Sequence, residues 1–425
     1  MLLLFGKVIC AYKDYFIQTG EAFMHNVHAI CDDTYWIGAS DRRLALFENT
    51  YHIPQGMAYN SYVILDEKTC LLDGVDDVVA SQFSENLDYM LGDRTLDYMV
   101  INHMEPDHCA EIPWLVKKFP NIKLVGTAKT FDFIRQFHNF DPEPYALKVT
   151  EGDTLELGKH ILQFVTAPMV HWPEVMVTFD LATGTLFSAD AFGEFGALGG
   201  NLFADEVNWE RDWLDQSRSY YANIVGKYGM QVNNLLKKAA ALPINRICPL
   251  HGHIWRKDLD VIRSKYAQWA SFEPEEKSVV IYYGTIYGGT GQAADILAGL
   301  LAQQGVRDVR VYNTATADLA TMVSEAFRAS HLVFASSTQN MEIFDAMRTL
   351  VLDLRAHAMQ KRHVALIENG SWAPQSGKLM REQFEAMKNI TIMEPSICIR
   401  SRLDDETLQQ ITVLAEAIVT SLGEE

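Results

Sequence analysis

The chain has 425 residues, of which 48% are hydrophobic and 21% are charged, ordinary values for a folded globular protein. This length is enough for two or three domains, each with its own core. The 55 acidic and 36 basic residues give a net charge of −19, which argues against nucleic acid and anionic membrane surfaces as partners.

The apolar residues among the first 23 positions show no helical or strand periodicity. Residues 1–6 are apolar, but Lys7 interrupts them and no signal-peptidase site follows, so we do not expect a signal peptide. No run in the sequence reaches the roughly 18 apolar residues that a membrane span requires. We expect residues 1–23 to be an extension of little functional weight, with Met24 preceding the first strand.

From Met24 to about residue 100, short β-rich runs alternate with turns, which favours hairpins in a sheet sandwich over a Rossmann-type start. Helical periodicity is present at 79–91 and at 109–118. Further elements alternate in the same way, with strands expected at 121–126, 161–166, 175–180 and 184–188 and a helix at 128–138. This alternation predicts a four-layer αββα sandwich.

The segment 101–109 carries four metal-binding side chains, His103, Glu105, Asp107 and His108. It follows an apolar run that predicts a buried strand, and α/β folds place their chemistry in loops at strand ends. Pro106 removes a backbone donor, so the strand does not simply continue. We expect the first two side chains to point one way and the last two another, which suits two adjacent metals better than one.

Three later residues follow apolar strand-like runs and could complete such a site: His171, Asp190 and His251. His253 is a competing candidate, which we expect to lie beside the site or at the surface. Residues 206–240 are predicted to be helical, with an aromatic stripe that favours core packing over a cofactor site.

Residues 256–271 are predicted to form a connecting helix and 272–277 a linker, because Pro274 and charged residues replace the apolar period. The pattern then changes to buried strands alternating with helices. This change predicts a doubly wound parallel sheet, with strands at 278–283, 309–312, 331–335 and 363–367.

Three loops at strand ends of this second half are candidates for binding a cofactor. The first is Gly-rich and opens a helix, so its backbone N–H groups can surround a phosphate. No Gly-Lys-Ser/Thr follows, which excludes a nucleoside triphosphate P-loop. The candidate residues are Thr285, Ile286, Tyr287, Gly288, Gly289, Thr290, Ser336, Ser337, Thr338, Gln339, Asn340, Asn369, Gly370, Ser371 and Trp372.

The motif His-x-Glu-x-Asp-His at 103–108 resembles the metal loop of the metallo-β-lactamase superfamily, in the variant of the flavodiiron proteins. A mixture of imidazole and carboxylate suits iron, whereas imidazole-rich sites suit zinc. The loop at 284–290 looks like the phosphate loop of a flavodoxin. The resemblance implies a metallo-β-lactamase-like diiron domain over 24–271 and a flavodoxin-like, FMN-binding domain over 278–420.

The resemblance also assigns roles. One iron would be bound by His103, Glu105 and His171, the other by Asp107, His108 and His251, with Asp190 bridging them. The family often carries a histidine in the substrate pocket, and Tyr51 or His52 could take its place. The family usually has proline at the position of His253, so this chain departs from the pattern there.

The implied activity is reduction of O2 to water and/or of NO to N2O, for detoxification, with electrons passed through FMN. No two of the six cysteines form a C-x-x-C pair, which excludes a rubredoxin module in this sequence, so the implied electron donor is a separate protein such as rubredoxin. The scattered cysteines favour the reducing cytoplasm. The implied assembly is a homo-oligomer, either a head-to-tail homodimer or a dimer of dimers.

Two alternatives belong to other classes. The first is a dizinc hydrolase of the metallo-β-lactamase type, against which Glu105 and the flavodoxin-like half argue. The second is a non-catalytic flavodoxin-type electron carrier whose first domain is only a scaffold. The complete set of ligand candidates argues against it.

Overall fold

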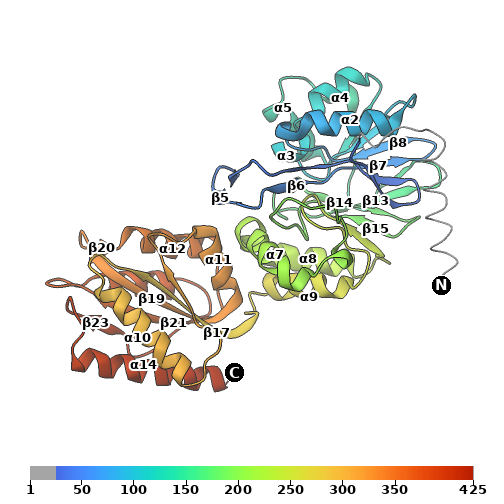
Figure 1. Cartoon of the computed structure of the whole chain (residues 1–425). Helices are drawn as coiled ribbons and strands as arrows, with labels where there is room; N and C mark the ends of the chain where they lie inside the picture. The colour runs from blue at the N-terminus through green and yellow to red at the C-terminus, as the bar shows by residue number, and fades with distance from the viewer. Residues whose placement is uncertain (1–24, 425) are drawn as a thin grey trace.

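The computed structural model describes residues 25–424, so the expected extension at 1–23 lies outside the described residues. Two halves follow one another along the chain, and within the described residues no strand of one half pairs with a strand of the other (Figure 1). No described helix combines the length and the apolar character needed to cross a membrane.

The N-terminal half contains two large sheets and two small two-stranded ones, β3 (Ala39–Asp41) with β6 (Met57–Tyr59) and β4 (Leu46–Phe47) with β5 (Tyr51–His52). The first large sheet is antiparallel from β1 to β8 and parallel from β8 to β11. Its strands, in spatial order, are β1 (His28–Cys31), β2 (Thr34–Trp36), β7 (Tyr62–Leu65), β8 (Thr69–Leu72), β9 (Tyr98–Val100), β10 (Lys123–Gly126) and β11 (Ala146–Lys148). The second has the order β12 (Thr154–Glu156), β13 (Ile161–Thr166), β14 (Met176–Asp180), β15 (Thr185–Phe187) and β16 (Arg246–Cys248).

The two large sheets pack face to face and helices cover their outer faces (Figure 1). Ile64 and Leu72 of the first sheet share a buried cluster with Phe164 and Met176 of the second. One outer layer contains α2 (Ala80–Leu91), α4 (Ile112–Lys118) and α5 (Ala128–Phe137). The other contains α7 (Leu214–Tyr220), α8 (Gly229–Ala239) and α9 (Leu259–Ala270). This is the αββα sandwich that the sequence predicted.

The C-terminal half is a doubly wound parallel sheet, as predicted. Its strand order is β18 (Arg310–Asn313), β17 (Glu276–Gly284), β19 (Ala329–Gln339), β21 (Arg362–Asn369) and β22 (Ile390–Ile392). Two short strands, β20 (Glu342–Ile343) and β23 (Ile397–Ile399), pair with the carboxyl ends of β19 and β21. Helices α10 (Gly289–Gln303) and α14 (Asp405–Glu424) cover one face. The other face is covered by α11 (Leu319–Arg328), α12 (Asp345–Ala356) and α13 (Ser376–Glu385).

The region 206–240 is helical but interrupted, which the sequence did not predict. Between α6 (Trp209–Asp212), α7 and α8, it contains a π-helical turn, η4 (Tyr221–Val225), whose five residues are all buried. An α-helix on a protein surface buries only one stripe. This turn is buried on all sides because it lies between the two halves, with Tyr221 contacting Trp269 of α9 and Phe327 of α11. The aromatic residues here are core, as expected.

A buried ion pair joins the two halves. Arg218 of α7 donates through Nε to Glu275, which directly precedes β17, at 2.8 Å, and both side chains are 2% exposed. Arg218 Nη1 also lies 3.4 Å from Ser324 Oγ of α11. Its other partners are Glu325, which is buried and lies 3.8 Å from Nη1, and Asp215, which is largely exposed.

Replacing Arg218 with methionine is expected to lower the free energy of unfolding by about 3 to 5 kcal/mol, because Glu275 then remains buried without its main counter-charge. Urea denaturation measures the change. The matched control is Asp215→Ala, which removes an exposed partner of the same arginine and is expected to cost less than about 1 kcal/mol. Equal losses in the two variants would contradict the assignment of the buried pair as the stabilising one.

Candidate metal centre

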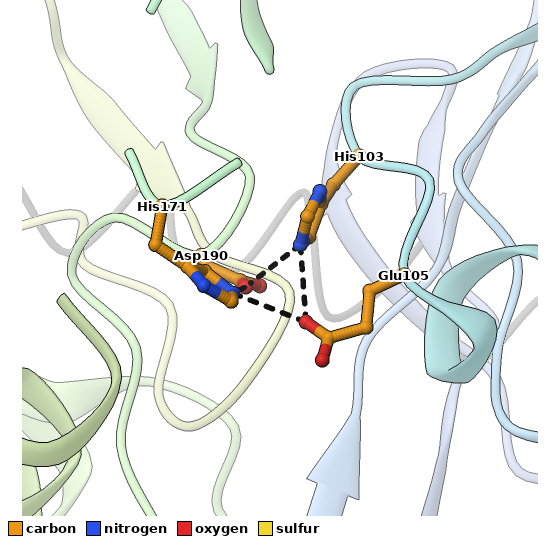
Figure 2. A group of neighbouring side chains, drawn as sticks. All are labelled: His103, Glu105, His171 and Asp190. Atoms are coloured by element: carbon orange, nitrogen blue, oxygen red, sulfur yellow. Dashed lines mark hydrogen bonds and ion pairs between the residues drawn. The ribbon is translucent and has the colours of Figure 1, made fainter. Parts of the chain in front are cut away.

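The seven predicted ligand side chains lie together and are all buried. They come from the chain just after the carboxyl ends of β9, β13, β15 and β16, so one rim of the sandwich carries them all. They form two groups, within each of which the ligand atoms lie within 4.8 Å of one another. The first group is His103, Glu105, His171 and Asp190, drawn in Figure 2, and the second is Asp107, His108 and His251.

The motif at 103–108 divides between the groups because the chain turns at Pro106. The sequence predicted a loop here, and the structure instead has a short helix, α3 (Pro106–Cys109), with proline at its first position. Proline is favoured there because that position needs no backbone donor. Glu105 is the extended N-cap residue, so it points away from Asp107 and His108 in the first turn.

Asp190 lies between the two groups. Its Oδ2 is 3.1 Å from His171 Nε2 of the first group, and its Oδ1 is 3.2 Å from His108 Nε2 of the second. In the first group Glu105 Oε2 is 3.1 Å from the Nε2 atoms of both His103 and His171 (Figure 2). Asp190 therefore presents one carboxylate oxygen to each group.

The buried carboxylates of the cluster require positive charge close to them. Burial raises the pKa of Asp190, but the imidazoles of His103 and His108 hold it well below its ordinary value. Burial lowers the pKa of His108, yet Asp107 and Asp190 raise it to about 9. The chain on its own thus offsets its buried carboxylates by protonating imidazoles, which is the role that a bound cation takes over.

The polar atoms of the second group also fit metal ions. Among the described residues, both carboxylate oxygens of Asp107, both ring nitrogens of His108 and Nε2 of His251 are buried and make no hydrogen bond. The Nε2 atoms of His108 and His251 lie 3.2 Å from carboxylate oxygens of Asp190 and Asp107, respectively, so their contacts are within the cluster. Buried polar atoms without a hydrogen bond are costly unless something binds them. The mixture of imidazole nitrogen and carboxylate oxygen suits iron.

Hydrogen bonds from outside the cluster orient its imidazoles. His103 Nδ1 donates to Glu174 Oε1 at 2.7 Å, and His251 Nδ1 donates to the carbonyl oxygen of Ala58 at 2.7 Å. Each bond leaves Nε2 facing the cluster, the usual arrangement of metal-binding histidines. Sequence analysis missed Glu174, and its only sequence signal is its place three residues after His171.

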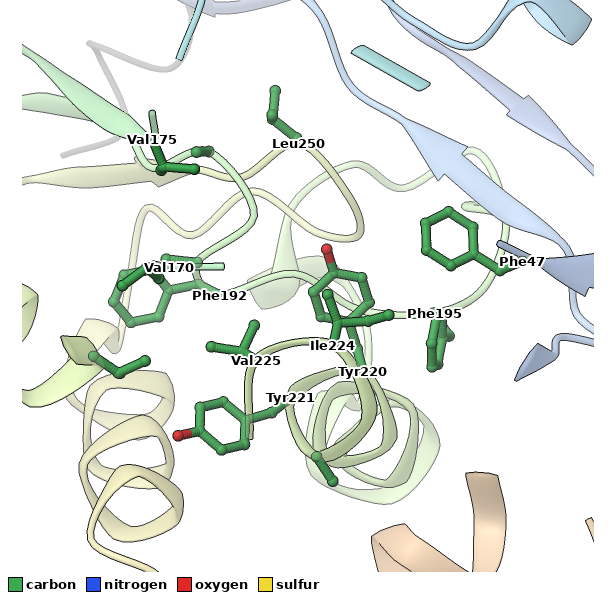
Figure 3. Close-up of a cluster of buried hydrophobic side chains, with 14 of the residues drawn as sticks. Phe47, Val170, Val175, Phe192, Phe195, Tyr220, Tyr221, Ile224, Val225 and Leu250 are labelled. Carbon is green, nitrogen blue, oxygen red and sulfur yellow. The ribbon is translucent and has the colours of Figure 1, made fainter. Parts of the chain in front are cut away.

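Apolar side chains form a dry wall beside the cluster (Figure 3). The rings of Phe47 and Tyr220 each lie 5.5 Å from the ring of His251. Phe195 packs on both aromatic rings. A low-dielectric wall of this kind strengthens the interactions of charges within the site.

A pocket of about 330 Å³ opens onto the first group at His171. Tyr51, one of two residues proposed for the substrate pocket, lines it, whereas His52 is exposed and does not. Sequence analysis missed Glu48, which also lines the pocket. Partial burial and the neighbouring Glu105 carboxyl raise the pKa of Glu48 to about 8.

A second cavity, of about 230 Å³, lies at the carboxyl ends of the strands in the C-terminal half. All three predicted loops line it, through Thr285, Ile286, Tyr287, Gly289, Ser337, Thr338, Asn340, Asn369, Gly370, Ser371 and Trp372. Gly288, Thr290, Ser336 and Gln339 do not line it. Thr290 is buried and its Oγ1 lies 2.9 Å from Ser337 Oγ, so it supports the loop from behind.

The cavity fits a flavin mononucleotide. Its floor lies against the N-terminus of α10, where backbone N–H groups favour a phosphate. A side chain at Gly289 would meet the carbonyl oxygen of Ser401 at 2.2 Å, so only glycine keeps this cradle open. Tyr287 and Trp372 are 98% and 82% exposed at its rim, where a planar ring would cover them. Ser401 also lines the cavity, and sequence analysis missed it because tertiary hydrogen bonds with Asn369 and Ser371 bring it there.

The chain is similar to one described protein family and to several named proteins. Residues 57–252 match the family described as ODP family beta lactamase. The chain is 31% identical over 351 residues to the anaerobic nitric oxide reductase flavorubredoxin of Pectobacterium carotovorum, covering 80% of this chain and 68% of that protein. It is also 31% identical over 347 residues to a protein of the same name from Escherichia coli, covering 80% of this chain and 72% of that one.

Solved structures agree with this comparison. The rubredoxin oxygen:oxidoreductase of Desulfovibrio gigas superposes with a TM-score of 0.88 at 25% identity, over 94% of this chain and 99% of that one. The flavodiiron protein of Giardia intestinalis gives 0.88 at 22% identity, over 95% and 99%, which shows the shared fold. With its ligand groups, the cavity at the strand ends of its C-terminal half and these relatives, the chain belongs to the flavodiiron protein family.

Proposed function

We propose that this protein is an oxidoreductase that reduces O2 to water and/or NO to N2O at a diiron centre, with electrons passed through FMN. The observation that carries the proposal is the pair of buried ligand groups sharing Asp190, in the same chain as a flavin-shaped cavity. The names of the relatives support both gases, since one is a nitric oxide reductase and another an oxygen oxidoreductase.

Each part of the proposed centre has a role that the chain's residues can perform. His103, Glu105 and His171 would hold one iron, Asp107, His108 and His251 the other, and Asp190 would span both. Two ferrous ions and a reduced flavin together would supply the four electrons that O2 needs. Glu174 fixes the ring of His103, and the wall around Phe47 and Tyr220 excludes water. Tyr51 and Glu48 line the entrance through which a small gas would reach the first group.

The finer assignments extend this proposal. We place the diiron domain at 24–271 and the FMN domain at 278–420. We place the protein in the cytoplasm, which is supported by its five described cysteines, all free thiols. The proposed electron donor is a separate protein such as rubredoxin, which the names of the relatives, flavorubredoxin and rubredoxin oxygen:oxidoreductase, support.

We further propose a head-to-tail homodimer, or a dimer of dimers, as the working assembly. Strands β20 and β23 adjoin the flavin-shaped cavity and lie at the end of the C-terminal half that is remote from the metal half (Figure 1). Exposed aromatic side chains surround the cavity at Tyr287 and Trp372, and Trp172 lines the pocket at the metal centre. A partner subunit in two-fold symmetry would bring these two surfaces together.

The purified protein is expected to contain about two irons and about one FMN per chain, the numbers that the two ligand groups and the one cavity imply. Elemental analysis and the visible flavin spectrum measure both. Stopped-flow mixing of the anaerobically reduced protein with O2 or with NO then identifies the substrate. Stoichiometric zinc without flavin, in protein made with iron available, would instead support the dizinc hydrolase.

A further inference from the structure

A fully buried carboxylate ties the loop that carries Asp190 to the loop that carries His251. Glu194, four residues after Asp190, is 0% exposed, and its Oε2 accepts hydrogen bonds from the Nδ1 and the backbone nitrogen of His253, at 2.8 and 3.3 Å. Its Oε1 accepts a hydrogen bond from the indole of Trp209. Both oxygens are therefore used, and Glu194 belongs to neither ligand group.

The loop after β16 is outside any named helix or strand, and side-chain hydrogen bonds hold it together with backbone ones. Asn60 holds it from one side by donating through Nδ2 to the carbonyl oxygens of Pro249 and Gly252, at 2.9 Å each. Glu194 holds the other side so closely that a side chain at Gly252 would lie 2.6 Å from the Glu194 Cβ. His251 thus lies between two fixed points of the loop.

His253 is the residue through which this contact acts. It is 1% exposed, and its ring packs edge-on against Trp213, with 4.5 Å between the ring centroids. A proline at this position would have neither the side-chain donor nor the backbone donor that Glu194 uses here. The contact that holds this side of the loop therefore requires both His253 and the buried carboxylate of Glu194.

The first ligand group has a separate support. Glu174 accepts hydrogen bonds from His103 Nδ1 and from the backbone nitrogen of Met104, at 2.7 and 2.9 Å. Glu174 makes no contact with the loop of His251 among the interactions described above, and Glu194 makes none with His103. The two ligand groups are thus supported by two different carboxylates.

We infer that Glu194, acting through His253, is a positioning residue that selectively sets the affinity of the second ligand group, Asp107, His108 and His251, for its metal ion. The inference rests on the proposed two-metal centre, but not on the reaction catalysed there. Loss of a group that is hydrogen-bonded directly to a metal ligand weakens metal binding by about 10- to 100-fold. Glu194 bonds His253, two residues from the ligand His251, so a smaller effect of up to about 10-fold is expected from its loss. The effect of losing Glu194 is expected to be larger at the ion of the second group, because its hydrogen bonds act on the loop of His251.

Cobalt(II) is the probe, because its visible absorption reports each occupied group without any need for gas reduction. The full-length protein is loaded with cobalt, and release to an excess of chelator is followed by absorbance. The His251→Ala variant identifies the phase that belongs to the second group. In Glu194→Gln that phase is expected to be faster by up to about 10-fold, with a smaller change in the phase of the first group. In Glu174→Gln the phase of the first group is expected to be faster instead.

Two matched variants at His253 distinguish a loss of loop positioning from a general loss of folding. His253→Leu removes the side-chain donor and is expected to accelerate the second phase, whereas His253→Gln keeps a donor and is expected to release cobalt like the parent protein. Equal acceleration of both phases in Glu194→Gln and His253→Leu would show a general loss of structure and overturn the inference. Selective cobalt release from a protein that purifies without iron or flavin would support the positioning role and refute the proposed function.

Discussion

Replacing Glu105 with histidine is expected to lower gas reduction by at least about 100-fold, more than the loss of an outer partner of a metal ligand costs, while FMN stays bound. Glu105 Oε2 lies 3.1 Å from two imidazole nitrogens of the first ligand group, so a third imidazole would replace its only carboxylate apart from the shared Asp190. The group then becomes rich in imidazole, which favours zinc over iron.

Elemental analysis, the flavin spectrum and gas consumption measure the three parts of this prediction. The flavin content is expected to be unchanged, because the cavity that would hold FMN is built from residues of the C-terminal half. The matched control is Glu105→Asp, which keeps an anionic oxygen at this position and is expected to retain more iron than Glu105→His. Full iron content and full turnover in Glu105→His would show that Glu105 is not a ligand.

Two inactive variants of the chain are expected to restore activity to one another when they form a mixed dimer. In the first variant, His103→Ala and Asp107→Ala remove ligands from both groups. In the second, Thr285→Asp places a negative charge at the phosphate end of the flavin cavity. A head-to-tail mixed dimer contains one intact metal centre facing one intact flavin, so about half of the parent activity is expected.

The two variants are co-expressed with different tags, and the mixed dimer is purified through both. Each variant alone must fold, the first with flavin and without iron, the second with iron and without flavin, and each must be inactive. If the mixed dimer is also inactive, electrons pass within one chain and the proposed head-to-tail arrangement is wrong. This result would leave the metal and flavin assignments standing, because both are measured in the separate variants.

Local sequence determined the fold class and the family. The periods of the apolar runs predicted an αββα sandwich followed by a doubly wound sheet, and the structure has both. The spacing of apolar residues shows which face of a strand or helix is buried, and this information lies within a few neighbouring residues. The spacing of His103, Glu105, Asp107 and His108 carries the family resemblance in the same local way, and the relatives confirm the family.

Only the tertiary structure decided how distant residues meet. Asp190 presents one oxygen to each ligand group, Ser401 reaches the flavin cavity through Asn369, and Glu194 braces the loop of His251 through His253. The π-helical turn at 221–225 likewise depends on the C-terminal half that packs on it. None of these contacts has a periodic signal, because each depends on the packing of elements that are far apart along the chain.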